Sequence, residues 1–536
     1  MPLGYFSLIL HAHLPFVRHP EYPEFLEEDW LYEAITEVYL PLIFIFQSLH
    51  ESGASPRLAM NISPPLCEML ADELLQTRYT AHLENLIELA RKEEVRTRSE
   101  AAEFHDVAQM YVENLTASHS LWNDRYKRNL LTAFRELNDE GVIEIITCAA
   151  THGFLPLIST PEAKNAQIEI AVKNYRKHFG RQPRGIWLAE CAYENGAEDL
   201  LKANGIEYFV SDTHAILYGS PRPKYGVHAP VVCPNGVAVF ARDVDTSRQV
   251  WSAEAGYPGN QLYREFYRDI GWDAPLEYLL PHLHSDGGRR HLGLKYHRIS
   301  PKGTPQDQKL PYIPSLARQR ASDDAADFIG KRIEQAKKLR ETFEGHPPLV
   351  VSPYDAELYG HWWYEGPQFI DFFFKKIHFD QDDIECITPG DFLDSGLPIQ
   401  VQQPIASSWG EAGYYKVWLN EGNSWMYPYQ HDAERRMTQL AVKFANDAGI
   451  SDTQNDLLDQ LARELLLAQS SDWAFQIYQG TTVQYSTRRF ESHIQRFNLI
   501  ADMLASGSVD QELFAEIATR DTIFPELDWR TYLPQT

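Results

Sequence analysis

Two acidic residues that end apolar segments are the first candidates for chemistry in this sequence. Glu190 closes the run "GIWLAE", just after Trp187, and Asp355 closes "LVVSPYD", shortly before Trp362. An apolar wall raises the pKa of a carboxyl group, whereas a hydrogen-bonded setting keeps a second carboxyl group ionised. Such a pair can cleave an acetal, because one group protonates the departing oxygen while the other meets the oxocarbenium-like carbon. The two acids therefore indicate glycosidase chemistry if folding brings their strands together.

Three histidines stand at similar places in the sequence. His11 and His13 directly follow the apolar run 5–10, and His152 closely follows the run 142–148. Strand ends at one edge of a parallel sheet are where such proteins carry their functional side chains. The residues alone leave two interpretations open, in which these imidazoles either bind a ligand or pack within the core.

Seven short apolar runs, each followed by polar residues, predict seven strands. They cover residues 5–10, 57–63, 142–148, 185–190, 206–212, 237–243 and 349–355. Helical periodicity between several runs, as in 71–91 and 163–179, makes strands and helices alternate, which predicts parallel pairing through crossover helices. A closed barrel and an open doubly wound sheet would both gather the strand-end residues at one edge, and we favour the barrel.

Two departures from this alternation predict further domains. Residues 96–139 read as consecutive helices without a strand, which indicates an inserted helical subdomain. After the Pro- and Gly-punctuated stretch 388–400 the strand signal fades, and leucines at helical spacing predict an all-helical domain over 396–536. The α/β catalytic barrel would then comprise residues 1–95 and 140–395.

Composition narrows the class of protein. A chain of 536 residues with 44% hydrophobic content can bury a large core, and a formal charge of -26 argues against binding nucleic acid. The 12 Trp and 28 Tyr residues suit the stacking of sugar rings, although aromatic residues also simply fill large cores. Five cysteines without paired spacing indicate reduced thiols, and we find neither a signal-peptide pattern nor an 18-residue apolar run. We therefore expect a cytoplasmic protein with no membrane contact.

Six motifs carry a resemblance that spans nearly the whole chain. In order they are "HAHLP", "THGFLP", "WLAECAY", "YDAELYGHWW", "SSWGEAGYYKVWLN" and "QSSDWAFQI". The first four resemble the sequence regions of glycoside hydrolase family 57. The last two are similar to the helical C-terminal lobe of the 1,4-α-glucan branching enzymes in that family.

The resemblance implies a (β/α)7 barrel that acts on α-1,4-glucans with retention of configuration, without a metal or another cofactor. Glu190 would be the nucleophile and Asp355 the general acid/base. The resemblance further implies a sugar-binding set comprising His11, His13, His152, Asp472, Trp409 and Trp418, with Trp30 and Trp272 in equivalent positions. In "YREFYRDIGWD", Arg264 and Arg268 lie four apart, so on a helix they would share one face and either could reach a sugar.

For a branching enzyme, an α-1,4-glucan polymer is both donor and acceptor, and nothing in the sequence demands more than a monomer or a weak homo-oligomer. Transfer requires that water be excluded, and the Pro- and Gly-rich segment 218–232, with Tyr225 or His228 near its tip, is a candidate cover loop.

Several alternatives remain. An α-amylase or a 4-α-glucanotransferase of the same family would use the same two acids. A His-X-His pair with a later histidine and an aspartate also occurs in metal-dependent hydrolases, but Glu190 would then have no role. A glycogen-binding regulator without turnover is disfavoured, because both strand-end acids are present.

Overall fold

All seven predicted strands form, and they pair in one curled sheet. The computed structural model describes residues 2–54, 56–252, 256–447 and 449–534. The strands are β1 (Gly4–Ala12), β2 (Leu58–Ile62), β3 (Ile143–Cys148), β4 (Gly185–Trp187), β5 (Tyr208–Ser211), β7 (Ala238–Ala241) and β8 (Leu349–Asp355). They are parallel to one another, as the alternation with helices predicts.

The strand order shows where the curled sheet is open. It runs β10-β6-β7-β5-β4-β3-β2-β1-β8, in which β6 (Val231–Val232) is antiparallel to β7, β10 (Gln400–Val401) pairs with β6, and β9 (Ile384–Cys386) also pairs with β1. The strand ladder is open between β7 and β8. Two backbone hydrogen bonds bridge this seam, from Asp243 to Val351 (2.9 Å) and from Leu349 to His228 (2.8 Å). The predicted α/β barrel class is confirmed. Between β7 and β8, two backbone hydrogen bonds connect the sheet in place of paired strands.

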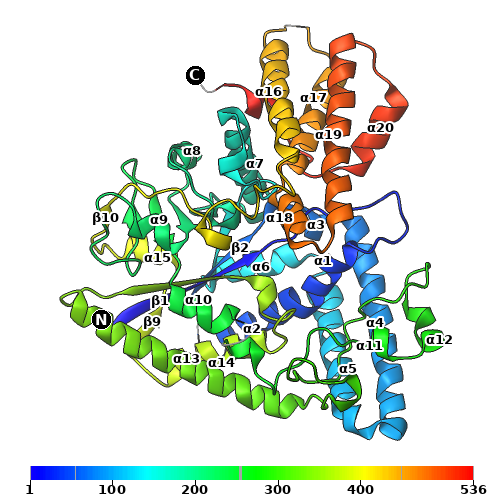
Figure 1. Ribbon diagram of the computed structural model, residues 1–536, viewed down its shortest axis with the longest axis vertical. Coiled ribbons are helices and arrows are strands. Elements are labelled where there is room, and N and C mark those ends of the chain that lie inside the picture. The colour runs from blue at the N-terminus through cyan, green and yellow to red at the C-terminus, as the bar shows by residue number, and fades with distance from the viewer. Residues whose placement is uncertain (1, 55, 253–255, 448, 535–536) are drawn as a thin grey trace.

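Helices cover the outer face of the sheet (Figure 1). They include α2 (Leu40–Glu51), α7 (Pro161–Phe179), α13 (Pro314–Thr342) and α14 (Gly366–Phe379). The bounds of α7 follow from its sequence, because the Thr160 side chain accepts from the Ala163 N–H at the start and Gly180 ends the helix at φ 70°. Among the described residues, none of the helices combines the length and the apolar composition that a membrane span requires.

Two helical regions stand apart from the sheet. Helix α4 (Glu73–Glu100) packs against α5 (His105–His119), and α4 runs through residue 95, where we predicted a domain boundary. The C-terminal helices form the upper lobe in Figure 1, drawn yellow to red. They are α16 (Met426–Ala445), α17 (Asp452–Ala468), α18 (Ser471–Gln479), α19 (Val483–Ser506) and α20 (Gln511–Arg520). The exact domain limits remain predictions.

The structure decides two possibilities that the sequence left open. Residues 261–269 form no helix, so Arg264 and Arg268 share no helix face. The segment 218–232 lies toward the amino end of β8, where Tyr225 stacks on His346 (4.2 Å between ring centroids), and not at the carboxyl ends of the strands. It therefore cannot serve as the cover loop. The five cysteines are free thiols, as their spacing predicts.

Candidate active site

The carboxyl ends of three neighbouring strands bring polar residues to one level. In the parallel register, His11 on β1 stands beside Asn61 on β2 and Asp355 on β8. His11 Nδ1 lies 2.5 Å from Asn61 Oδ1, and its Nε2 lies 3.1 Å from His152 Nε2. The His11 ring also stacks on Trp187, with 4.5 Å between centroids. The sheet register thus assembles the cluster that the sequence predicted at the strand ends.

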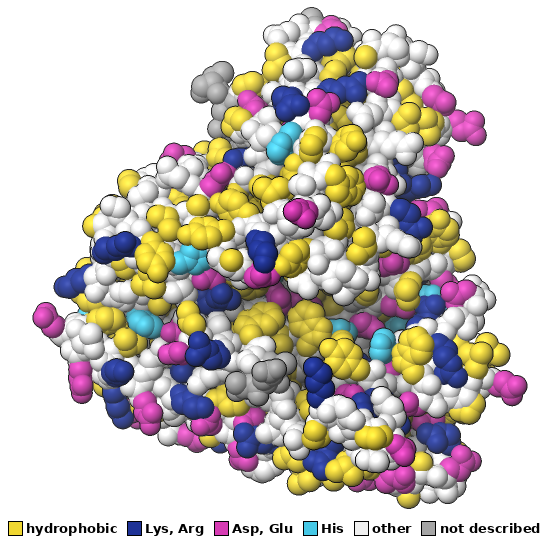
Figure 2. All heavy atoms as spheres, viewed as in Figure 1, with side chains coloured by type: hydrophobic (Ala, Val, Ile, Leu, Met, Phe, Trp, Pro, Cys, Tyr) yellow, Lys and Arg dark blue, Asp and Glu magenta, His cyan; other side chains and the backbone are white. Residues whose placement is uncertain are grey.

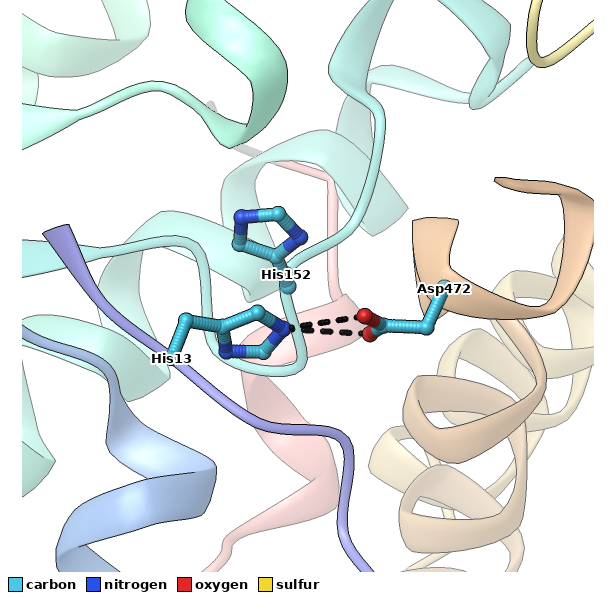
Figure 3. Close-up of side chains that lie close together, drawn as sticks. All are labelled: His13, His152 and Asp472. Atoms are coloured by element: carbon cyan, nitrogen blue, oxygen red, sulfur yellow. Dashed lines mark hydrogen bonds and ion pairs between the residues drawn. The ribbon is translucent and has the colours of Figure 1, made fainter. Parts of the chain in front are cut away.

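His13 extends this cluster to the helical lobe. Its Nδ1 lies 2.8 Å from Ser63 Oγ, and its Nε2 lies 3.1 Å from an oxygen of Asp472 at the start of α18, as Figure 3 shows. Burial raises the pKa of the Asp472 carboxyl, but His13, His152 and the Ser470 hydroxyl together outweigh burial and hold that pKa at about 2. Asp472 is therefore an anion that faces the barrel.

His13, His152 and Asp472 also have the spacing of a metal site, since one ligand atom of each lies within 4.8 Å of the others. Their orientation does not suit a metal. The two imidazoles stack nearly parallel, with 3.8 Å between centroids and 16° between planes, so their in-plane lone pairs do not converge. Both nitrogens of His152 also contact other partners, His11 and Ser471. The cluster fits hydrogen bonding better than metal binding.

Glu190 lies in a tight turn that follows β4, at φ 62° and ψ 24°. A residue other than glycine in this region costs about 1–3 kcal/mol, which indicates that the surrounding contacts hold it there. Trp409 Nε1 donates to Oε2 (2.8 Å), and the Ser471 hydroxyl lies 3.3 Å from Oε1. Burial raises the pKa of Glu190, the Trp409 donor lowers it and Asp472 raises it, and the net pKa is about 7.

Asp355 ends β8 in a different environment. No described residue donates a hydrogen bond to its carboxylate, whereas Glu190 has two candidate donors. Burial first, then the neighbouring Glu357 and Glu190 carboxylates, raises the pKa of Asp355 well above its usual range. These surroundings favour the protonated form of Asp355, while Glu190 is the group that its donors help to ionise. This is the division of roles that acetal cleavage requires.

Glu357 is a site residue whose role the sequence did not reveal. Its Oε1 accepts from the Tyr39 hydroxyl (2.5 Å) and from the His13 backbone N–H (3.3 Å). Tyr39 lies on a π-helical turn, residues 35–39, between helices α1 (Glu28–Ala34) and α2. Single π turns inside helices often mark functional sites, but apolar periodicity does not predict them.

The aromatic residues predicted to stack on sugars differ in exposure. Trp272 is 52% exposed, whereas Trp30 and Trp409 are half-buried. The face of the molecule in view in Figure 2 has a hollowed middle, along which hydrophobic side chains lie. Trp418 is 1% exposed and stacks on Phe154 (4.5 Å between centroids), so it presents no free face to a sugar. The stacking role predicted for Trp418 is therefore wrong in this structure.

The two arginines do not reach toward the acids. The buried Arg264 guanidinium stacks over Tyr364 (3.9 Å) and donates to the Tyr111 hydroxyl (3.0 Å). It lines a cavity of 520 Å³ that α2, α5 and α14 also border. Arg268 pairs with Asp273 (2.7 Å). Because both guanidinium groups are occupied by protein partners, their predicted sugar contacts have no support here.

Comparisons with known proteins agree with this geometry. Residues 7–329 match the family Glycosyl hydrolase family 57, and residues 429–532 match the region described as 1,4-alpha-glucan branching enzyme, C-terminal. The α-amylase AmyC of Thermotoga maritima has a similar structure, with a TM-score of 0.94 and 43% identity over 100% of both chains.

Two branching enzymes are also similar. The structure of a family 57 branching enzyme from Pyrococcus horikoshii gives a TM-score of 0.87 and 33% identity, over 100% of this chain and 97% of that one. A 1,4-alpha-glucan branching enzyme of Thermococcus kodakarensis is 33% identical over 97% of this chain and 77% of its own length. With its sheet, its two strand-end acids and its helical lobe, the chain belongs to glycosyl hydrolase family 57.

Proposed function

We propose that the protein is a retaining 1,4-α-glucan branching enzyme, with an α-1,4-glucan as both donor and acceptor. One observation carries the proposal. The side-chain hydrogen bonds to the Glu190 carboxylate come from Trp409 and from Ser471 at the start of α18, outside the barrel strands. The adjoining helices match the C-terminal region of branching enzymes. The lobe therefore belongs to the candidate site itself.

The first half of the reaction cleaves the donor. Ionised Glu190 attacks the anomeric carbon of an α-1,4 bond, while protonated Asp355 gives its proton to the departing oxygen. A covalent glycosyl-Glu190 ester and a shortened glucan result. Asp472 and the three clustered histidines recognise hydroxyl groups of the bound glucose. Their polar atoms make hydrogen bonds with one another in this structure, and with glucose bound they make hydrogen bonds to the sugar hydroxyl groups as well.

The second half forms the branch. Asp355, now a carboxylate, takes the proton from the C6 hydroxyl of an acceptor glucan, which attacks the ester and displaces Glu190. Water at the same position would give hydrolysis instead. The exposed Trp272 and the half-buried Trp30 are the aromatic faces that we assign to the acceptor chain.

α-Amylase activity is the second candidate, because the 43% identical structure is that of a protein described as an α-amylase. The test is to incubate the protein with amylose and to measure new α-1,6 linkages and new reducing ends together. We expect the linkages to exceed the reducing ends. Reducing ends without branches would favour the amylase, and a redistribution of α-1,4 chain lengths without branches would favour a 4-α-glucanotransferase. Activity that a chelator abolishes would contradict all three.

We also propose that the protein is cytoplasmic and is a monomer or a weak oligomer. Five free thiols, four of them buried, suit a reducing compartment. Light scattering of the purified protein across a concentration series tests the oligomeric state.

A further inference from the structure

A continuous row of hydrogen-bonding groups ends at Glu190. It runs from Asn61 Oδ1 to His11 Nδ1 (2.5 Å), from His11 Nε2 to His152 Nε2 (3.1 Å), and from His152 Nδ1 to Ser471 Oγ (2.8 Å). The last step joins Ser471 Oγ to Glu190 Oε1 (3.3 Å). Ser471 thus stands between an imidazole and the proposed nucleophile.

The number of protons in this row is limited. With both imidazoles neutral, His11 donates to Asn61, His152 donates from Nε2 to His11, and Ser471 donates to His152 Nδ1. The single hydroxyl proton of Ser471 is then used, so its contact with Glu190 is a hydrogen bond only if Glu190 carries a proton and donates it. When Glu190 is ionised and Ser471 donates to it, every contact is satisfied if His152 Nδ1 carries the proton instead.

The backbone fixes Ser471 in this place. Its N–H donates to the His152 carbonyl (3.1 Å), and Gly153 and Ser470 form an antiparallel bridge. His152 itself is held at φ 57°, and its Nδ1 lies 3.9 Å from Glu190 Oε1. The helical lobe therefore sets the hydroxyl between the two titratable groups with little freedom to move.

We propose that Ser471 is a positioning residue that passes a proton between Glu190 and His152. The inference rests on the proposed role of Glu190 as the nucleophile. The Oε1–H bond of Glu190 breaks as Ser471 Oγ takes that proton, and the hydroxyl proton of Ser471 moves to His152 Nδ1. The net result is a Glu190 carboxylate and a His152 imidazolium, formed without exchange with bulk water.

The surrounding charges act on both ends of this pair. Burial, the largest effect, raises the pKa of Glu190 and lowers that of His152, so each charge is unfavourable alone. Asp472 favours the imidazolium, whereas His13 and His11 oppose it. Trp409 and His13 favour the ionised form of Glu190, whereas Asp472 disfavours it. The Glu190 carboxylate also raises the pKa of Asp355. Formation of the two charges together, 3.9 Å apart, offsets part of what burial costs each.

The pH dependence of kcat/KM tests the relay. Ser471→Ala should raise the midpoint of the acidic limb by about one pH unit, because the Glu190 carboxylate loses a donor. It should also lower kcat by about tenfold or more. Ser471→Thr keeps the hydroxyl and should restore the midpoint. Ser486→Ala is the control, since Ser486 is a buried serine of the same lobe that bonds only within it, to Gln476 and Thr482. An unchanged midpoint in Ser471→Ala, or an equal shift in the control, would overturn the inference.

Nitrogen NMR of histidine-labelled protein gives a second readout that needs no activity. The His152 signal is assigned by its absence in His152→Gln. In the wild type it should show a fraction protonated on Nδ1 at about pH 7, where Glu190 is partly ionised. That signal should disappear in Glu190→Gln, because a glutamine amide cannot pass a proton. A His152 protonated only on Nε2 throughout would overturn the relay. If Glu190→Gln kept full activity, the proposed function itself would be wrong, whereas an inactive Glu190→Gln with an unshifted Ser471→Ala would reject the relay alone.

Discussion

At the scale of the residue, the hydrogen-bond donors around the two acids distinguish them better than burial does. Both carboxyls are partly enclosed, and burial is the largest cause that raises the pKa of each. Glu190 has Trp409 and Ser471 beside its oxygens, and Asp355 has no donor among the described residues. Sequence alone predicted both acids because each ends an apolar run. It could not predict Ser471 as a partner, because 281 residues separate it from Glu190.

The proton of Asp355 matters only when the leaving group needs one. Asp355→Asn should lower kcat on amylose by about 10²–10⁴-fold, the usual contribution of a general acid. Formation of the glycosyl-enzyme from an α-maltosyl fluoride should be nearly unaffected, because fluoride departs without a proton. Steady-state and burst kinetics on the two substrates measure the difference. The exposed Asp432→Asn is the matched control, and an equal loss on both substrates would contradict the assignment.

The raised pKa of Glu190 also predicts an effect on stability. The folded state binds this proton more tightly than the unfolded chain, whose glutamates titrate near about 4.3. The contribution of Glu190 to stability is therefore complete below that pH and is lost as the pH rises through about 7. At pH values above about 7, the free energy of unfolding of Glu190→Gln should be higher than that of the wild type by up to about 3 kcal/mol.

Urea unfolding at about pH 8 and at about pH 5 measures this difference. The gain of Glu190→Gln should shrink at the lower pH, and the exposed Glu526→Gln should show neither a gain nor a pH dependence. A gain of the same size at both pH values would mean that the ionisation of Glu190 does not cause it.

At the scale of the element, the turn after β8 rests on the π-helical turn of residues 35–39. Tyr39 holds Glu357, the Glu37 carboxylate lies 2.6 Å from His361 Nδ1, and Gly360 packs on the Glu37 carbonyl. The sequence predicted the seven strands because apolar runs with polar ends are distinctive. It left open whether 261–269 is a helix, because two arginines four apart imitate a helix face, and the structure shows no helix there. No periodicity marks the π turn, because its effect depends on contacts with a segment more than 300 residues later.

Substitution of Gly360 tests whether the π-helical turn of residues 35–39 holds the turn after β8 in place. A methyl group at Gly360 would collide with the Glu37 carbonyl oxygen, and the glycine also has φ +131°. Gly360→Ala should therefore lower the melting temperature and displace the turn that follows Asp355, so kcat falls even where the protein remains folded. Gly330→Ala, on α13 with nothing within 4 Å, should stabilise the protein by about 0.5–1 kcal/mol and leave kcat unchanged. Wild-type kcat in Gly360→Ala would show that the turn tolerates movement.

At the scale of the whole molecule, the lobe and the barrel share buried contacts beyond the candidate active site. The Arg489 guanidinium on α19 donates to the Phe16 carbonyl (3.1 Å), and the Tyr485 hydroxyl lies 3.0 Å from His19 Nε2. Composition and helical spacing predicted a helical lobe. They could not show that its residues complete the site, because that depends on docking rather than on any local pattern. Since both parts supply site residues, loss of docking should abolish activity.

This docking predicts that the full chain unfolds in one calorimetric transition. Arg489→Met should lower the free energy of unfolding by about 3–5 kcal/mol, because it removes a buried cation that also lies 3.9 Å from Asp521. Arg488→Met, at an exposed neighbouring position, should change little. Activity and the calorimetric signal should be lost together as each protein is heated. Two separated transitions in the wild type, or an active site that survives unfolding of the lobe, would mean that the lobe is an independent domain and that its contacts with Glu190 are dispensable.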